Sequence, residues 1–381
     1  MSEESSYPKI KPDLEDIGPN LEVDVGNMET RIADSQPASQ NHVHETEPQN
    51  GTTNVISIES DTGNSQSLSS SKSLSEHIIE DILENERRYC NETYFMPNDE
   101  AEQTRLSIEH QIYLIIFDGQ LTKTKLPPTI SRILDVGTGT GDWALGMGEM
   151  YPEAEILAID ISVFDSDPIS IAPPNVFFQI DDAEYGEWNY HHPFDFIHIR
   201  GLSGGIADWP ALYRQAFKNL EPDGCIEVVD VDYTTGLLNA RNAPANSYLS
   251  IFISAIRSAA DVSGYPRDLA HLRMSALTSA GFVQVRTYDT RVPIGTWCED
   301  DARGNTLGKM VLIVLLEGLE AASMRSLTKY VGWTPEEVRD LCDKVKMEIV
   351  MGATEGAMGI VKVVTGRKPG KESGFINEND S

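Results

Sequence analysis

From residue 131 onward, short apolar runs bounded by turn residues alternate with helical stretches, and this alternation restricts the possible folds more than any other feature of the sequence. Strands that alternate with helices are typical of βαβ units, whose strands lie parallel in one sheet. The runs that predict strands cover 132–136, 155–160, 176–180, 194–199, 225–231, 282–288 and 360–365. The sequence therefore predicts an α/β fold with a seven-stranded, mostly parallel sheet.

Helices are predicted before, between and after these strands. Ser75 is a suitable N-cap for a helix with apolar residues at 78, 79, 82 and 83, and a second helix is expected over about 99–118. Both belong to an N-terminal helical section, residues 76–130. Further helices are expected at about 208–220, 266–280, 305–330 and 335–350. The domain that carries the sheet spans 131–369, and we expect its helical insertion, about 300–357, to form a lid over a bound acceptor.

The two ends of the chain differ from this middle part. Residues 1–75 are acidic and rich in Ser, Asn, Gln, Glu and Pro, and Tyr7 is their only aromatic residue. Such a segment buries too little apolar surface to offset the entropy lost on ordering. We therefore expect a disordered acidic tail at 1–75 and a disordered C-terminus at 370–381.

Composition excludes several classes of function. The chain has 60 acidic and 30 basic residues and a formal net charge of −30, which argues against binding to nucleic acid or to anionic membranes. The longest apolar run, Met310–Leu316, is far shorter than a membrane span. The four cysteines have no CxxC spacing, so they give no zinc site and fit free thiols in a reducing compartment. We expect a cytoplasmic protein without a metal, with the nucleus as an alternative location.

The loop after the first predicted strand carries the strongest functional signal. It reads Asp135-Val-Gly137-Thr-Gly139-Thr-Gly141, and its glycines permit a tight turn and close approach of a ligand to the backbone. The G-x-G-x-G spacing differs from the G-x-G-x-x-G of dinucleotide sites. Asp135 suits a ligand with positive charge, such as the ammonium and sulfonium of S-adenosyl-L-methionine. Asp160, at the end of the second strand, is placed to accept hydrogen bonds from both ribose hydroxyls; the alternative is an ordinary βα turn beside a surface carboxylate.

Several blocks resemble one family. They are Ile133-Leu-Asp-Val-Gly-Thr-Gly-Thr-Gly141, Ile180-Asp-Asp-Ala-Glu184, Phe194-Asp-Phe-Ile-His-Ile-Arg200, Gly332-Trp-Thr-Pro-Glu-Glu-Val338, and Arg87-Arg-Tyr89 with Met96-Pro-Asn-Asp-Glu100. Together they resemble the class I S-adenosyl-L-methionine-dependent methyltransferases, and more narrowly the fungal LaeA-like methyltransferases of secondary metabolism. The resemblance covers about 76–369 and implies a Rossmann-like fold and S-adenosyl-L-methionine as cofactor.

The resemblance also implies roles for single residues. The methionine and ribose part of the cofactor would lie against Gly137, Thr138, Gly139 and Gly141. Asp135 would orient the charged end of the cofactor, directly or through water, and Arg200 would hold its methionine moiety. The adenosine part would be held by Asp160 at the ribose, Ile161 against the adenine ring, Asp182 at the adenine amine and Ala183 beside it. Tyr89 would close over the cofactor from the N-terminal section, or else pack between helices.

The sequence leaves the catalytic group open. A base is needed only where the acceptor must lose a proton, and the strand ends offer His198, Glu227, Asp230 and Asp232. His198 is a weak candidate, since a core histidine with satisfied hydrogen bonds explains it better. Arg200 stands where metal-dependent catechol enzymes need a carboxylate, which also argues against a metal.

Two functions remain. The first is a methyltransferase of fungal secondary metabolite biosynthesis that acts on an O or N atom of a small molecule. The second is a LaeA-like regulator of secondary metabolism in a complex with velvet-type proteins. The leucines at 312, 315, 316 and 319 indicate a helix side that faces the core or a second copy in a homodimer.

Overall fold

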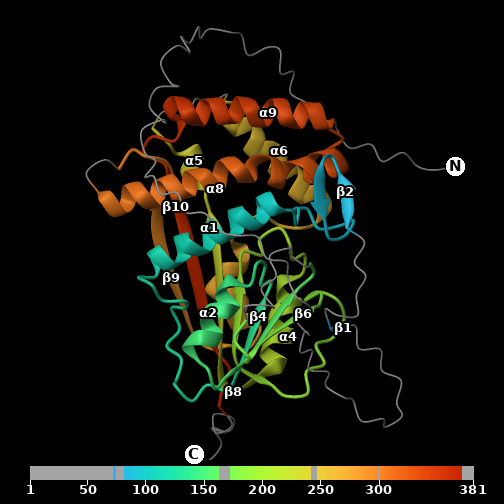
Figure 1. Ribbon diagram of the computed structural model, residues 1–381, viewed down its shortest axis with the longest axis vertical. Helices are drawn as coiled ribbons and strands as arrows, with labels where there is room; N and C mark the ends of the chain where they lie inside the picture. The colour runs from blue at the N-terminus through green and yellow to red at the C-terminus, as the bar shows by residue number, and fades with distance from the viewer. Residues whose placement is uncertain (1–71, 74–80, 163–171, 242–246, 299–300, 371–381) are drawn as a thin grey trace, which may run out of the picture. The chain divides into compact units, whose positions relative to one another are not determined.

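An eight-stranded sheet forms the centre of the structure, with the strand order β1-β6-β5-β4-β7-β8-β10-β9 (Figure 1). Its strands are β1 (Lys72–Ser73), β4 (Arg132–Val136), β5 (Glu155–Asp160), β6 (Val176–Ile180), β7 (Phe194–Arg200), β8 (Leu220–Asp232), β9 (Val283–Pro293) and β10 (Met358–Arg367). Neighbours from β6 to β8 are parallel, whereas β10 is antiparallel to both β8 and β9. The predicted α/β fold with seven main strands is therefore confirmed.

This computed structural model describes residues 72–73, 81–162, 172–241, 247–298 and 301–370. All of them belong to one compact unit, Met1–Ile10 with Ser69–Ser381, and the second unit, Lys11–Leu68, lies outside the described residues. The predicted disorder of 1–75 and 370–381 concerns residues that are almost all outside the described part. Within it, Lys72–Ser73 pairs antiparallel with β6 as strand β1, which composition could not indicate.

The central strands are covered on both faces. Ile133, Leu134 and Val136 of β4 are at most 1% exposed, as expected for a parallel strand between two helical layers. The flanking helices are α2 (Asp142–Met150), α4 (Trp209–Asn219) and α7 (Met274–Ser279). Asp208 caps α4 by accepting from the backbone N–H of Ala211, and Pro210 fits its first turn. These contacts fix the strand ends where ligands bind in such sheets.

A second group of helices lies beyond one end of the sheet (Figure 1). It comprises α1 (Glu100–Ile116), α5 (Thr234–Leu238), α6 (Tyr248–Ser263), α8 (Ala302–Ser326) and α9 (Pro335–Glu348), with short π-helical turns at Leu327–Val331 and Ile349–Ala353. Helices α8 and α9 stand between β9 and β10 in the chain, and α8 packs on α1 and on α9. Leu319 is buried and Leu312, Leu315 and Leu316 pack against the same cluster, so this side of α8 faces the core.

Two helix predictions are wrong. Residues 82–89 form a hairpin of β2 (Ile82–Glu84) and β3 (Arg87–Tyr89) instead of a helix. Its two-residue turn, Asn85-Glu86, has positive φ at both positions (51° and 67°), as a type I′ turn requires, but lacks the glycine that usually marks one. The helix expected over 266–280 is reduced to a 3₁₀ turn, Ala270–Leu272, and α7. Among the described helices, none is long and apolar enough to span a bilayer.

Candidate cofactor and acceptor site

The glycine loop leaves the C-terminal end of β4 in a backbone conformation that favours glycine. Gly137, Gly139 and Gly141 have φ of 70°, 58° and 83°. The N–H groups of Gly137 and Thr138 donate to the carbonyl of Ile159 at 2.9 and 3.0 Å. The loop is thus fixed to the end of β5, and Gly141 becomes the N-cap of α2.

Asp160 joins the loop to the neighbouring strand. Its Oδ2 accepts from the N–H of Gly139 at 2.8 Å, and its Oδ1 accepts from the N–H of Ser162 at 3.0 Å. Each oxygen keeps capacity for a second donor. Burial raises the pKa of Asp160 to about 6, although these two hydrogen bonds favour the ionised form. The carboxylate lines both cavities described below.

We expect cofactor affinity to fall as the pH drops through about 6, the pKa of Asp160 in the free protein. Ribose hydroxyls donate to the ionised carboxylate, so the cofactor binds the charged form of Asp160 more tightly. Protonation of Asp160 below this pH removes the charged form and weakens binding. Calorimetry between about pH 5 and about pH 8 measures the Kd of S-adenosylhomocysteine for the wild type and for Asp160→Asn, whose side chain cannot titrate. An equal pH dependence in both proteins would assign the effect to another group.

A buried chain of hydrogen bonds supports the loop from below. Asp135 Oδ2 accepts from the Thr138 hydroxyl at 2.7 Å, and its Oδ1 lies 2.8 Å from His198 Nδ1. His198 is 1% exposed and stacks on Trp143 with a centroid distance of 3.8 Å. Neither Asp135 nor His198 lines either of the two cavities described below. His198 therefore positions Asp135 inside the core and has no access to an acceptor, which supports the core-histidine interpretation.

The first cavity, about 820 Å³ of empty space, brings together the residues predicted for the adenosine part. It is lined by Gly137, Asp160, Ile161, Asp182 and Ala183, among others. Asp182 Oδ1 accepts from the N–H of Glu184 at 2.9 Å, so the carboxylate is held in place at the end of β6. Sequence reasoning missed the opposite wall, which includes Tyr94, Phe95, Leu202, Tyr265 and Arg267.

The second cavity, about 1390 Å³ of empty space, adjoins the first and contains part of the remaining predicted set, whereas Tyr89, Asp135 and Gly141 line neither cavity. Thr138, Gly139 and Arg200 line it. The two cavities share the wall residues Tyr94, Phe95, Gly137, Asp160, Leu202 and Arg267. The two cavities therefore adjoin one another at the end of the glycine loop.

Helix α1 contributes several polar side chains to the second cavity, among them Arg105, Glu109 and His110. His110 Nδ1 lies 3.2 Å from the Nη2 of Arg200, and burial, with this guanidinium, lowers the pKa of His110 to about 4. Because a guanidinium only donates, the neutral His110 accepts at Nδ1. Tyr113 lies under Arg200, 4.8 Å from the guanidinium carbon to the ring centre, and its buried hydroxyl has no partner among the described residues. An unpartnered buried hydroxyl at a cavity wall marks a place for a ligand.

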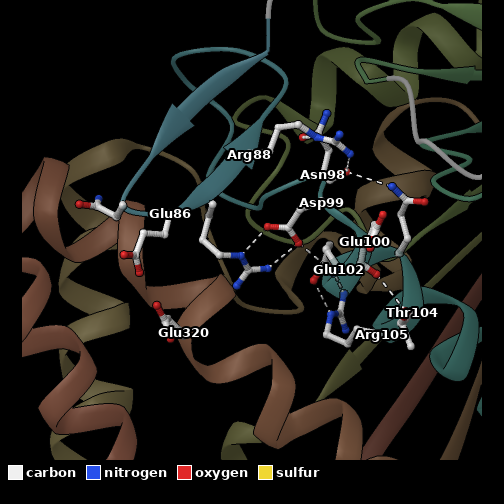
Figure 2. A network of polar contacts seen from close by, with 12 residues as sticks. Glu86, Arg88, Asn98, Asp99, Glu100, Glu102, Thr104, Arg105 and Glu320 are labelled. Carbon is white, nitrogen blue, oxygen red and sulfur yellow. Dashed lines mark hydrogen bonds and ion pairs between the residues drawn. The ribbon is translucent and has the colours of Figure 1, made fainter.

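The blocks Arg87-Arg-Tyr89 and Met96-Pro-Asn-Asp-Glu100 are joined by polar contacts, and we call this pair of segments the clamp (Figure 2). Arg87 donates to both oxygens of Asp99 at 2.5 and 2.9 Å, while Asp99 caps α1 by accepting from the N–H of Glu102. Arg88 donates to the carbonyl of Asn98 at 2.8 Å. The chain between these anchors includes Tyr94 and Phe95, so the clamp holds both side chains at the cavities.

Tyr89 does not close over either cavity. It lies in β3, fully buried, with the guanidinium of Arg325 3.6 Å from its ring centre. Arg325, on α8, also donates to the carbonyls of Asn91 and Tyr94 at 2.5 and 2.9 Å. The burial of Tyr89 agrees with the packing alternative, and Tyr94 and Phe95 are the aromatic residues of this segment that line both cavities.

Other candidate groups are engaged elsewhere. Glu227 accepts from the N–H and hydroxyl of Thr124, both at 2.7 Å, and Asp232 accepts from Thr235 at the start of α5. Asp230 does line the second cavity and accepts from the N–H of Ser203 at 2.9 Å. Within the described ranges no three His, Cys, Asp or Glu side chains are grouped as metal ligands.

Comparison with known proteins agrees with this geometry. The family described as "Methyltransferase domain" matches residues 107–285. Methyltransferase pytC of Aspergillus terreus is 34% identical over 325 residues, covering 83% of this chain and 97% of that protein. Secondary metabolism regulator LAE1 of Cochliobolus heterostrophus is 30% identical over 282 residues, covering 72% and 90%. Probable methyltransferase tdiE of Emericella nidulans is 30% identical over 301 residues, covering 76% and 90%.

These similarities extend well beyond the glycine loop, because they cover 72–83% of the chain. A short shared motif could arise from the cofactor alone, whereas identity over this length reflects common descent of the whole fold. The chain therefore belongs to the fungal, LaeA-like family of class I methyltransferases, enzymes with S-adenosyl-L-methionine as their cofactor.

Proposed function

We propose that this protein transfers the methyl group of S-adenosyl-L-methionine to an O or N atom of a small molecule in fungal secondary metabolism. One observation carries the proposal: two adjoining cavities share Gly137 and Asp160 in their walls. The first suits an adenosine, and the second offers room and polar groups for an acceptor. The similarity to pytC and tdiE supports an enzymatic role.

The residues around the first cavity fit this cofactor. Gly137 has a φ of 70°, which favours glycine, and a Cβ there would come within 2.5 Å of Cδ2 of Leu202, so this wall side chain would have to move. Asp160 can accept from the ribose hydroxyls with the capacity left on each oxygen, and Asp182 can accept from the adenine amine. Ile161 would pack on the adenine ring, and Asp135 would act through Thr138.

The protein's task is mainly to bind, orient and exclude water. S-Adenosyl-L-methionine brings an activated methyl group, so the chain need not activate a donor. Tyr94, Phe95 and Leu202 separate the site from solvent, and Arg200 can pair with the cofactor carboxylate. If the acceptor must lose a proton, Asp230 is the carboxylate of β8 that lines the second cavity.

The alternative function is regulation in a complex with velvet-type proteins. Its support is the similarity to regulators named LAE1 and laeA, at 30% identity over more than two thirds of this chain. A methyl acceptor would then be a protein, or turnover would be secondary to assembly. Both functions require the same cofactor site, so they differ in where the methyl group goes.

We would incubate the full-length protein with methyl-tritiated S-adenosyl-L-methionine and a lysate of the source organism. The lysate is then separated into protein and organic extract. Label in the extract is the expected result, and label in protein would favour the regulatory function. The same lysate without the added protein serves as the control, because any label found there comes from lysate enzymes. Absence of label above this control would contradict the proposed transfer.

A further inference from the structure

Two guanidinium groups line the second cavity without a carboxylate partner among the described residues. Arg200 contacts neutral His110 and the ring of Tyr113, and Arg267 contacts only neutral groups. Arg105, the third arginine of this cavity, is different because Glu102 and Glu109 bind it at 2.7–2.9 Å. Charged groups removed from water are normally paired, so each free guanidinium calls for an anion.

Three contacts hold the guanidinium of Arg267 in the site. Its Nη1 donates to the carbonyl of Ala322 at 3.0 Å and its Nη2 to the hydroxyl of Ser326 at 2.6 Å, both on α8. Its guanidinium carbon lies 3.8 Å from the ring centre of Phe95. Burial lowers its pKa to about 10, which leaves it charged at neutral pH. The guanidinium lines both cavities and keeps N–H groups that these two contacts do not use.

The cofactor supplies only one carboxylate for these two groups. Arg200, the last residue of β7, lines the same cavity as the glycine loop and is the partner expected for it. We propose that Arg267 binds a carboxylate group of the methyl acceptor. This inference rests on the proposed function, because it presumes a small-molecule acceptor in the second cavity.

A carboxylate fits this cavity better than a phosphate. The guanidinium fork matches either group in shape. Glu109, Asp160 and Asp230 also line the cavity, however, and they would repel a doubly charged phosphate more strongly than a singly charged carboxylate. The acceptor class is therefore a small organic acid whose methylated atom lies elsewhere in the molecule or on the acid itself.

The first test fractionates the organic-soluble metabolites of the source organism on an anion exchanger at neutral pH. The full-length protein and methyl-tritiated cofactor are added to the retained and unretained fractions separately. Label in the retained fraction is expected. Label confined to the unretained fraction would overturn the proposal and leave the methyltransferase function intact. Label in neither fraction would contradict the proposed function itself.

A second test does not depend on turnover. With S-adenosylhomocysteine bound, benzoate should raise the melting temperature of the wild type, and benzamide, its neutral analogue, should not. Arg267→Gln should abolish the benzoate effect, whereas Arg257→Gln, which removes an exposed charge from α6, should keep it. Equal effects of benzoate and benzamide on the wild type would overturn the proposal.

Kinetic measurements on the same variants show whether Arg267 binds the acceptor or only supports the fold. With the retained fraction as substrate, Arg267→Gln should raise KM about tenfold to a hundredfold and change kcat little, the loss expected for one charge-assisted pair. Affinity for S-adenosylhomocysteine should stay within about twofold of the wild type. A tenfold loss of that affinity with an intact benzoate effect would assign Arg267 to the cofactor carboxylate instead.

Discussion

Asp160→Ala is expected to weaken binding of S-adenosyl-L-methionine by about 1.5–3 kcal/mol, or roughly tenfold to a hundredfold in Kd. The variant loses the two charge-assisted hydrogen bonds assigned to the ribose. It also frees the N–H of Gly139, which Asp160 holds at 2.8 Å, so the glycine loop loses one of its contacts with β5. Isothermal titration calorimetry on the purified full-length protein measures the change directly.

Asp232→Ala is the matched control for this measurement. Asp232 also stands at the end of a strand, but it accepts from the N–H of Thr235 in the first turn of α5 and lines neither cavity. Its loss should leave the cofactor Kd within about twofold of the wild type. A similar Kd for Asp160→Ala and the wild type would show that the ribose is held elsewhere.

Arg325→Met should destabilise the folded protein by about 3 kcal/mol. The substitution leaves the carbonyls of Asn91 and Tyr94 without their donor and removes the cation that packs on Tyr89. Its ion pair with Glu84 contributes less, because that carboxylate is 35% exposed. The midpoint of urea unfolding, with Arg257→Met as the exposed counterpart, gives the difference.

The same variant should also impair cofactor binding, because Arg325 anchors the chain that carries Tyr94 and Phe95. A protein that is destabilised yet binds S-adenosylhomocysteine normally would show that the wall does not depend on this anchor. An unchanged unfolding midpoint would contradict the stabilising role itself.

The sheet could be predicted because its signals are local. Each central strand is a short apolar run between turn residues, and Pro222-Asp-Gly224 and Thr334-Pro335 mark helix boundaries within a few residues. The β2–β3 hairpin could not be predicted in this way. Leu83 is 79% exposed there, so this member of the apolar spacing that suggested a helix does not face the core. The turn has Asn85-Glu86, which carries no glycine signal.

In the candidate site, too, residues with local sequence signals could be predicted, whereas residues placed by long-range contacts could not. Gly137, Gly139 and Asp160 could be named because a glycine loop and a strand-end carboxylate are signals within one βαβ unit. The role of His198 could not be settled until β4 and β7 were paired, which sets His198 beside Asp135. The wall of Tyr94 and Phe95 depends on Arg325, more than 230 residues away in sequence, and no local pattern reports such a contact.

The contact between Arg325 and this wall has a consequence for how substrate preference can change. Arg325 holds main-chain carbonyls at positions 91 and 94, and carbonyls are present whatever side chain stands there. Tyr94 and Phe95 can therefore be replaced without loss of the anchor that fixes their backbone. Related enzymes could diversify their acceptors by substitution at these positions while the cofactor side of the fold stays the same, and a library randomised at 94 and 95 is a direct route to altered specificity.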